Sequence, residues 1–266
     1  MTTADARGAQ PAAVASPLSY LGVWTRQEVR LLAREPVAVF FSLVFPLVIL
    51  AFIGSAYADE EIKDGVRFIE VMFPALLGTV AANITTMGLP IYFGELRARG
   101  VLKRYRSLPV PGWLVGVAIE GSLVLLLIVS AAVVSAAVGI FYGLRITAIS
   151  PLFLLLMLGL VTWLSCVGFV LGALPVKTRT VQSISAAVFF LMFFGSGYAA
   201  PIDGLPSWLQ FITSFNPLRF WFDALTNVYL GDPISGGDVG KLMATLVGAA
   251  LTFALALRLY GAESNG

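Results

Sequence analysis

Six long apolar runs leave few folds open to this sequence. They cover residues 37–57, 69–93, 113–142, 152–174, 181–200 and 242–260. A helix needs roughly 20 apolar residues to cross a bilayer, and each run approaches or exceeds that length. Only 12% of the residues are charged and 58% are hydrophobic, which is about half the charged fraction of soluble domains. The sequence therefore predicts an all-α integral membrane protein whose domain, 37–260, has six transmembrane helices.

Several kinds of chemistry are excluded by the residue types present. The sequence has no histidine and one cysteine, Cys166, so it lacks His-based acid–base catalysis, His metal sites and internal disulfides. The stretch SGGDVGKL at 235–242 resembles a phosphate-binding loop but has Ser and Leu where that loop needs Gly and Ser or Thr. We expect no catalytic residue, metal ligand or ATP site on this chain.

The distribution of lysine and arginine predicts the orientation, because cytosolic connections are enriched in these residues. Connections on one side hold 12 bases: Arg7, Arg26, Arg30, Arg34, Arg97, Arg99, Lys103, Arg104, Arg106, Lys177, Arg179 and Arg258. The other side holds 5: Lys63, Arg67, Arg145, Arg219 and Lys241. We therefore expect both termini, including the tail 261–266, to lie in the cytosol.

The N-terminal region divides at about residue 18. Residues 1–17 are small and polar and predict a disordered tail rather than a signal peptide. In 18–36, Arg26, Arg30 and Arg34 form one stripe of a helix with apolar residues opposite. This predicts an interfacial amphipathic helix that Pro36 ends; an ordinary basic anchor beside the membrane is the alternative.

The cytosolic connection 93–112 is basic and carries apolar residues at helical spacing from Gly94. The prolines at 109 and 111 end the predicted short helix. A loop held on anionic lipid explains the bases, whereas the compact apolar face favours docking into a groove of a cytosolic partner. We expect no nucleic-acid partner.

The outer connection 201–239 is too polar to span and too aromatic for a solvated loop. The sequence predicts two short re-entrant helices split at Asn216-Pro217, either half sunk in the outer leaflet or packed on the bundle.

Glu120 is the one carboxylate well inside a predicted span. It either serves a substrate path, couples protons or locks helices, or it is an acid that reaches the inner interface. Three Gly-x-x-x-Gly spacings, at 112–116, 139–143 and 168–172, permit close helix approach within or between chains.

Three stretches in order resemble the ABC type 2 permeases, the group that includes daunorubicin-resistance and polysaccharide-export permeases. They are LLAREPVAVFFSLVFPLV (31–48), FGELRARGVLKRYRSLPVPGWLVG (93–116) and GYAAPIDGLPSWLQFITSFNPLRFWFDAL (197–225). With the six runs, the resemblance covers nearly the whole chain after residue 17. The short tail and small outer loops look more like the drug-resistance branch.

The resemblance implies an ATP-driven exporter subunit in the plasma (inner) membrane. It implies two separate ATPase subunits that bind ATP and Mg²⁺, and a second permease, either an identical copy or a relative. Family substrates are hydrophobic drugs, lipids and lipid-linked glycans, and export of drugs gives antibiotic resistance.

The resemblance also assigns roles to residues. A coupling helix would include Glu95, Arg97, Arg99, Gly100, Leu102, Lys103 and Arg104. An outer gate would include Pro201, Pro206, Trp208, Asn216 and Pro217. The alternative function is a proton-coupled secondary transporter that uses Glu120.

Overall fold

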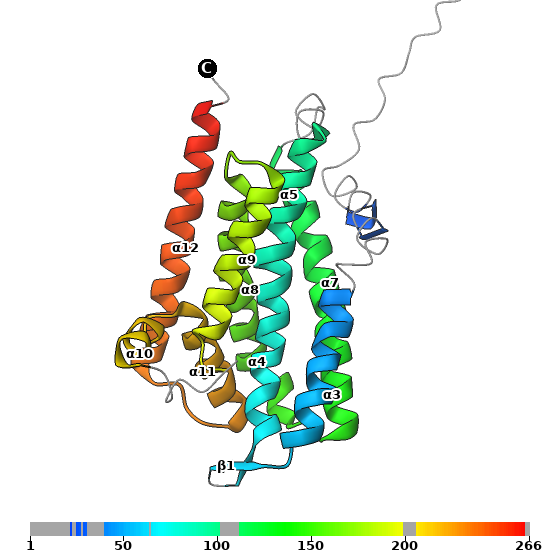
Figure 1. The fold of residues 1–266 in the computed structure, drawn as a ribbon, viewed down its shortest axis with the longest axis vertical. Coiled ribbons are helices and arrows are strands. Elements are labelled where there is room, and N and C mark those ends of the chain that lie inside the picture. Colours follow the sequence, from blue (N-terminus) through cyan, green and yellow to red (C-terminus); the bar gives the residue numbers. More distant parts are fainter. Residues whose placement is uncertain are drawn as a thin grey trace, which may run out of the picture.

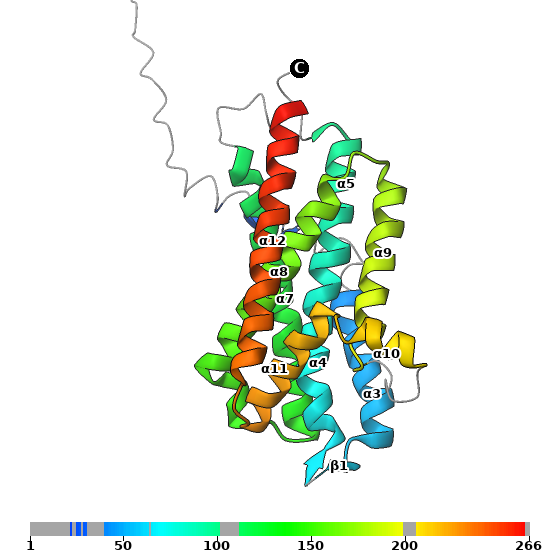
Figure 2. The ribbon, with the colours of Figure 1, turned by 90° about the vertical axis from the view of Figure 1, so that its left-hand side faces the viewer.

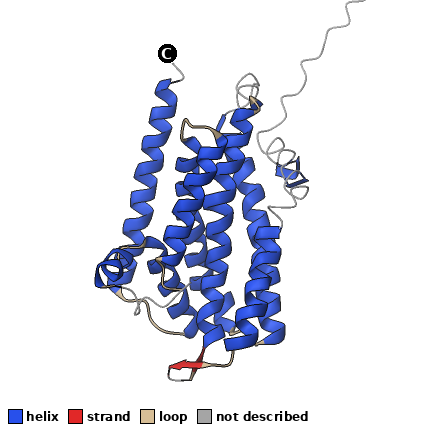
Figure 3. Ribbon diagram, viewed as in Figure 1, coloured by secondary structure: helices blue, strands red, loops and turns tan. Residues whose placement is uncertain are grey.

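A bundle of long helices is the architecture of the protein in a computed structural model (Figures 1 and 3). The structure describes residues 22, 25–27, 29–30, 40–63, 65–101, 112–198 and 206–263. Its helices are η1 (Phe40–Val44), α3 (Phe45–Tyr57), α4 (Phe68–Ala82), η2 (Asn83–Gly88), α5 (Leu89–Ala98), α7 (Gly112–Phe141), η3 (Ile146–Ile149), α8 (Pro151–Ala173), α9 (Thr178–Phe194), α10 (Ser207–Thr213), α11 (Pro217–Leu230) and α12 (Gly236–Glu263).

A small β-hairpin is an exception to the predicted all-α fold. Strands β1 (Glu61–Lys63) and β2 (Val66–Arg67) pair antiparallel between α3 and α4. Gly65 supplies the turn, since its φ of 78° lies in the region that favours glycine. The Gly65 N–H also donates to the Glu61 carboxylate over 2.5 Å.

Four helical segments of the described chain are long and apolar enough to cross a membrane: Phe68–Ala98, Gly116–Phe141, Pro151–Ala173 and Gly236–Ala254. They correspond to the second, third, fourth and sixth predicted spans. The first and fifth correspond to shorter apolar helices, Ser42–Tyr57 and Thr178–Phe194. The mostly helical membrane fold is thus confirmed, and the count of six spans stays a prediction.

The second predicted span was too short. We expected it to end near residue 93 and a separate helix to begin at Gly94. Instead α4, η2 and α5 form one helix from Phe68 to Ala98, and a left-handed Gly100 (φ 71°) follows it. Gly94 and Leu96 are buried, because the apolar stripe of the span continues into this stretch.

This long helix lies at the centre of the bundle. Within its most apolar window 78% of the residues are buried, against 11% for α12. Its π-helical turn η2 carries Thr85 and Thr86, whose hydroxyls donate to the carbonyls of Ala81 and Ala82. These bonds satisfy side chains that are almost fully buried.

Glycines of α8 let the central helix approach closely. A Cβ on Gly168 would lie 2.2 Å from the Thr85 carbonyl oxygen, and one on Gly172 would lie 3.3 Å from the Cα of Pro90. The spacing 168–172 therefore serves packing inside the chain. Gly143, in another of the three spacings, lies beyond the end of α7 in a left-handed conformation (φ 82°).

Connections predicted to share a side of the membrane lie at the same end of the bundle. The end of α5, the α8–α9 turn and the C-terminal end of α12 lie at one end, here called the α5 end (Figures 1 and 2). The β1–β2 hairpin lies at the opposite end, the β1 end, and α10 lies in the half of the bundle nearer to it (Figure 1).

The N-terminal predictions fall mostly outside the described residues, as does the tail 1–17. Residues 22, 25–27 and 29–30 of the predicted amphipathic helix are helical, with Arg26 and Arg30 exposed and Thr25 and Val29 half-buried. Arg34 lies outside the description. At the other terminus, α12 extends past residue 260 to Glu263, and 264–266 are not described.

The stretch that resembles a phosphate-binding loop begins a helix. The Ser235 hydroxyl accepts a hydrogen bond from the Asp238 N–H over 3.1 Å and donates to the Asp238 carboxylate over 2.7 Å. A Ser followed three residues later by an acid is a helix-starting pattern, and here it starts α12.

The contact between α8 and η2 generates a first prediction. Gly168→Ala places a methyl group against a backbone carbonyl that cannot rotate away, so we expect a loss of about 1–3 kcal/mol in the free energy of unfolding. Gly248→Ala in α12 is the matched control, because nothing lies within 4 Å of that position. Thermal unfolding of both variants in lipid nanodiscs measures the difference. Equal midpoints would show that the two helices are not in this close contact.

Candidate functional site

Arg97, predicted as a coupling-helix residue, binds another helix of the bundle. Its guanidinium donates hydrogen bonds to the carbonyl oxygens of Gly172 and Leu174. These carbonyls end α8, where the helix leaves carbonyls without internal partners and carries the negative end of its dipole. Arg97 therefore joins the end of α5 to the end of α8.

A second bond joins the same part of α5 to α9. The Thr178 hydroxyl, in the first turn of α9, donates to the Gly94 carbonyl over 3.0 Å. A Cβ on Gly94 would lie 3.3 Å from the Thr178 side chain, so the two backbones are close. We call the contacts of Arg97 with α8 and of Thr178 with Gly94 the α5 junction.

The other predicted coupling residues are exposed or lie outside the description. Glu95 and Arg99 form an ion pair over 3.2 Å, with 43% and 71% of their side chains exposed. Gly100 has a positive φ of 71°, a conformation that favours glycine. Leu102, Lys103 and Arg104 lie outside the described residues. The acid and base of this segment thus remain on the surface at the α5 end.

Glu120 faces α8 of its own chain. Its Oε1 accepts a hydrogen bond of 2.5 Å from the Ser165 hydroxyl, and Ser165 is 7% exposed. Its other carboxylate oxygen, Oε2, is buried with no hydrogen-bond partner in the described structure. Of the roles considered from the sequence, locking two helices together matches this contact.

The predicted break at Asn216-Pro217 lies between α10 and α11. The Asn216 side-chain oxygen accepts from the Leu218 N–H over 3.0 Å, which caps α11. Its amide nitrogen donates to the Met192 carbonyl in the last turn of α9 over 2.6 Å. Pro217 occupies the first turn of α11, where no backbone donor is needed. The break therefore also attaches α11 to α9.

The two helices of the predicted outer hairpin have different surroundings. In α11, Trp221, Phe222 and Tyr229 are almost fully buried. Phe222 packs on Gly78 of α4 and Trp221 on Gly159 of α8, at positions where a Cβ would collide with each ring. Of the two placements considered, packing on the bundle is therefore correct for α11.

Helix α10 and the residues directly after it present an apolar strip to their surroundings. Trp208, Phe211 and Phe215 are each 65–67% exposed, and Phe211 and Phe215 contact each other edge to face at 5.1 Å. Pro206 precedes the helix at its N-cap. Pro201 lies outside the described residues.

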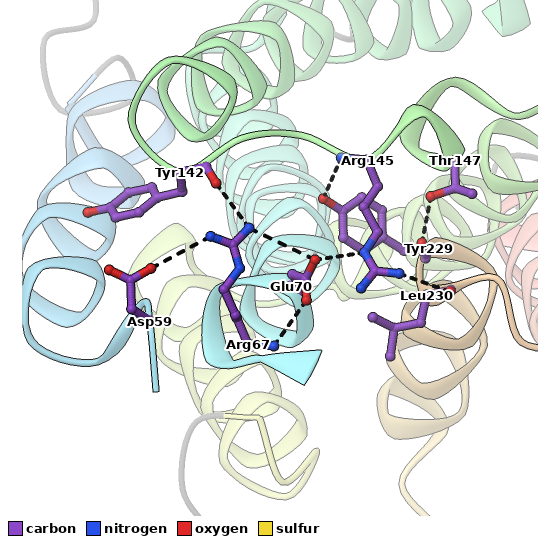
Figure 4. Close-up of polar contacts among 8 residues, drawn as sticks. All are labelled: Asp59, Arg67, Glu70, Tyr142, Arg145, Thr147, Tyr229 and Leu230. Carbon is purple, nitrogen blue, oxygen red and sulfur yellow. Dashed lines mark hydrogen bonds and ion pairs between the residues drawn. The ribbon is translucent and has the colours of Figure 1, made fainter. Parts of the chain in front are cut away.

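A polar cluster that we did not predict holds the β1 end of the bundle together (Figure 4). Glu70, whose side chain is 10% exposed, accepts from the Arg145 guanidinium over 2.7 Å. It also accepts from the backbone N–H of Arg67 over 3.0 Å. The Arg67 side chain donates to the Tyr142 carbonyl over 3.1 Å and lies 3.6 Å from Asp59. The Glu70 carboxylate raises the pKa of the Arg145 guanidinium.

The same cluster attaches the C-terminal end of α11 to the α7–α8 connection. The Arg145 side chain donates to the Leu230 carbonyl over 3.2 Å, and the Thr147 hydroxyl donates to the Tyr229 carbonyl over 2.5 Å. The Tyr229 hydroxyl accepts from the Arg145 N–H over 3.2 Å. The available signal in the sequence was an acid and a base, Glu70 and Arg145, that both lie near span ends on one predicted side.

The structure offers no group of three or more His, Cys, Asp or Glu side chains that could hold a metal ion among the residues it describes. Cys166, half-buried in α8, lies near Glu120. Two sets of polar contacts thus join helices of the bundle: the α5 junction at one end and the cluster around Glu70 and Arg145 at the other.

Comparison with known proteins bears directly on this arrangement. The profile of a family described as "ABC-2 type transporter" matches residues 20–230. The chain is 30% identical over 163 residues to a protein named "Probable multidrug ABC transporter permease YbhR" from Escherichia coli strain K12, and equally to that of Escherichia coli O157:H7.

The matched segment is 58% of this chain and 43% of each relative, so the chain spans less than half the length of the curated relatives it matches. The family profile covers the central helix, all residues of the α5 junction and the whole α10–α11 hairpin. The chain therefore belongs to the ABC-2 type transporter family.

Proposed function

We propose that the protein is the permease subunit of an ATP-driven exporter and works with separate ATP-binding subunits. The observation that carries this is the family match together with the surface at the α5 end. There the central helix ends at Ala98, and a segment whose sequence is basic with apolar residues at helical spacing follows Gly100. ATP and Mg²⁺ would bind on two copies of the partner, and a second permease, identical or related, would complete the transporter.

The names of the similar proteins favour a hydrophobic substrate. The Escherichia coli relatives are named as multidrug permeases, which supports a hydrophobic drug as substrate and a place in the drug-resistance branch. Lipids and lipid-linked molecules are also hydrophobic, and they are the alternative substrates.

We propose that α10 is the moving part of the exit gate and that α11 is its fixed frame. Three sets of contacts hold α11: Asn216 at its start, the rings of Trp221 and Phe222 in its middle, and Arg145 with Thr147 at its end. Moving α11 would break all of them, whereas the aromatic side of α10 is exposed. A gate needs a part that moves at low cost, and α10 meets that requirement.

Proton-coupled transport through Glu120 receives less support than ATP-driven export. The carboxylate contacts Ser165 across the α7–α8 interface, which is what a residue that locks two helices would do. A locking role accounts for the acid without a proton pathway.

The proposed topology has six spans in the plasma (inner) membrane, with both termini in the cytosol. Lys177→Cys, in the exposed α8–α9 turn, and Asp232→Cys, after α11, lie at connections assigned to opposite sides. In a Cys166→Ala background, an impermeant thiol reagent added to intact cells should modify only the second. Modification of both, or of the first alone, would contradict this topology.

The coupling proposal predicts that Leu102→Asp disrupts the contact with the ATP-binding subunit. An unpaired carboxylate in an apolar contact is costly, so recovery of the co-expressed partner in a pull-down should fall at least about tenfold, which is 1.4 kcal/mol.

Arg99→Met is the comparison, because it removes one exposed charge and leaves the apolar stripe intact. Its effect should be smaller and should disappear in high salt, which screens exposed charges. A lipid-bound loop predicts the reverse: full recovery with Leu102→Asp and a larger, salt-sensitive loss with Arg99→Met.

The division of the hairpin predicts different defects for two tryptophans. Trp221→Ala should cost about 3–5 kcal/mol in the free energy of unfolding because it empties a packed site and removes the bond from the indole N–H to Thr245. Trp208→Ala should leave the unfolding midpoint unchanged and stop efflux of a fluorescent hydrophobic dye while ATP hydrolysis continues. Normal efflux by a well-expressed Trp208→Ala protein would rule out α10 as the gate.

A further inference from the structure

The α5 junction fixes three helix ends to one another. Arg97 binds the last carbonyls of α8 and Thr178 ties the first turn of α9 to Gly94 of α5. Gly172 of α8 also packs on Phe93, at 3.2 Å from a Cβ built there. The end of α5, the end of α8 and the start of α9 therefore cannot separate without breaking charge-assisted or close backbone contacts.

Helix α9 extends from this junction to the α10–α11 hairpin (Figure 2). It has 17 residues, which gives it a length of about 25 Å at 1.5 Å per residue. Its sequence has neither Pro nor Gly between Thr178 and Phe194, so nothing in it favours a kink. Phe189 stacks on Phe193, and Phe190 on Phe194, at spacings that support a straight helix.

The far end of α9 is also attached, in this case to the hairpin. Asn216 donates to the Met192 carbonyl. Gly195, directly after α9, lies so close that a Cβ there would be 2.9 Å from the Asn216 amide nitrogen and 3.6 Å from Thr213 at the end of α10. A shift of α9 along its axis therefore acts on the residues between α10 and α11.

We propose that Arg97 is a positioning residue for transport: it makes the end of α5, the α8–α9 turn and α9 move as one body. A displacement of the segment after Gly100 is then passed through α9 to the end of α10, where Gly195 lies close to Thr213, while the body of α11 stays in place. The residue acts through the carbonyls it binds and touches neither ATP nor substrate. This inference rests on the proposed function, because the displacement comes from the ATP-binding subunit.

The physical reason is the shape of the guanidinium. Its planar fork binds two carbonyl oxygens at a fixed spacing, and the receiving carbonyls bear the negative end of the α8 dipole. Discrete hydrogen bonds between rigid helices are the kind of connection that transmits a movement across a bundle. A hydrophobic contact in the same place would hold the helices together but would let them slide.

The test follows the hairpin directly. A Ser207→Cys reporter, exposed at the start of α10, is placed in a Cys166→Ala background and reconstituted in nanodiscs with the co-expressed ATP-binding subunit. The rate at which a maleimide modifies this cysteine is measured without ATP and with ATP plus vanadate. The parent protein should show an ATP-dependent change in rate.

Arg97→Met and Thr178→Val should each abolish this ATP-dependent change while the partner still co-purifies and hydrolyses ATP. Both variants keep the size of the side chain and remove its donors, and the unfolding midpoint establishes that they are folded. Arg179→Met, an exposed base one residue beyond Thr178, is the matched control and should keep the parent's change. Arg97→Lys should restore part of it, because an ammonium group still donates to these carbonyls.

Two outcomes separate the inference from the proposed function. If folded Arg97→Met keeps the full ATP-dependent change, the positioning role is wrong and the proposed function stands. If no ATP-binding subunit co-purifies with the parent protein, or if ATP does not change the maleimide rate in the parent, the proposed function fails. The positioning role then fails with it.

Discussion

The contact between the central helix and the glycines of α8 is the constraint on which the rest of the structure depends. In lipid no hydrophobic force drives helices together, so association relies on close packing at small residues. Gly168 brings the η2 backbone against α8, and Gly172 does the same for Pro90 and Phe93. These approaches fix the register between the two helices. That register decides which polar side chains can meet at either end of the bundle.

Polar groups at helix ends are satisfied by side-chain hydrogen bonds, most of them to partners distant in the sequence. Arg97 supplies donors to the last carbonyls of α8, Asn216 caps α11 and binds α9, and Glu70 with Arg145 joins α4 to the α7–α8 connection. An apolar solvent makes an unsatisfied backbone group costly, so these side chains stabilise the fold. The same attachments make the bundle a set of connected helices, as a transporter requires if events at one end are to affect the other.

The aromatic residues of the hairpin fall into two groups, one buried on α11 and one exposed on and directly after α10. Trp221, Phe222 and Tyr229 are buried in the bundle, whereas Trp208 and Phe211 on α10, and Phe215 directly after it, are exposed. Both sets look alike in composition. Their difference follows from the glycines that face them, since Gly78 and Gly159 open the spaces that the rings of α11 fill. Membership of the ABC-2 type transporter family gives this difference its meaning: a fixed helix and an exposed one at the proposed exit.

The sequence by itself determined the membrane class, the approximate positions of the long helices except the end of the second, the break at Asn216-Pro217 and the family. Apolar run length and local turn chemistry are properties of neighbouring residues, and they need no knowledge of packing. Only the tertiary structure decided that Arg97 binds the α8 carbonyls, that Glu70 meets Arg145 and that Glu120 faces Ser165. The members of these pairs are 45 to 77 residues apart, and their meeting depends on helix register. Register is set by which backbones can approach at glycine, a relation between surfaces that no single stretch of the sequence contains.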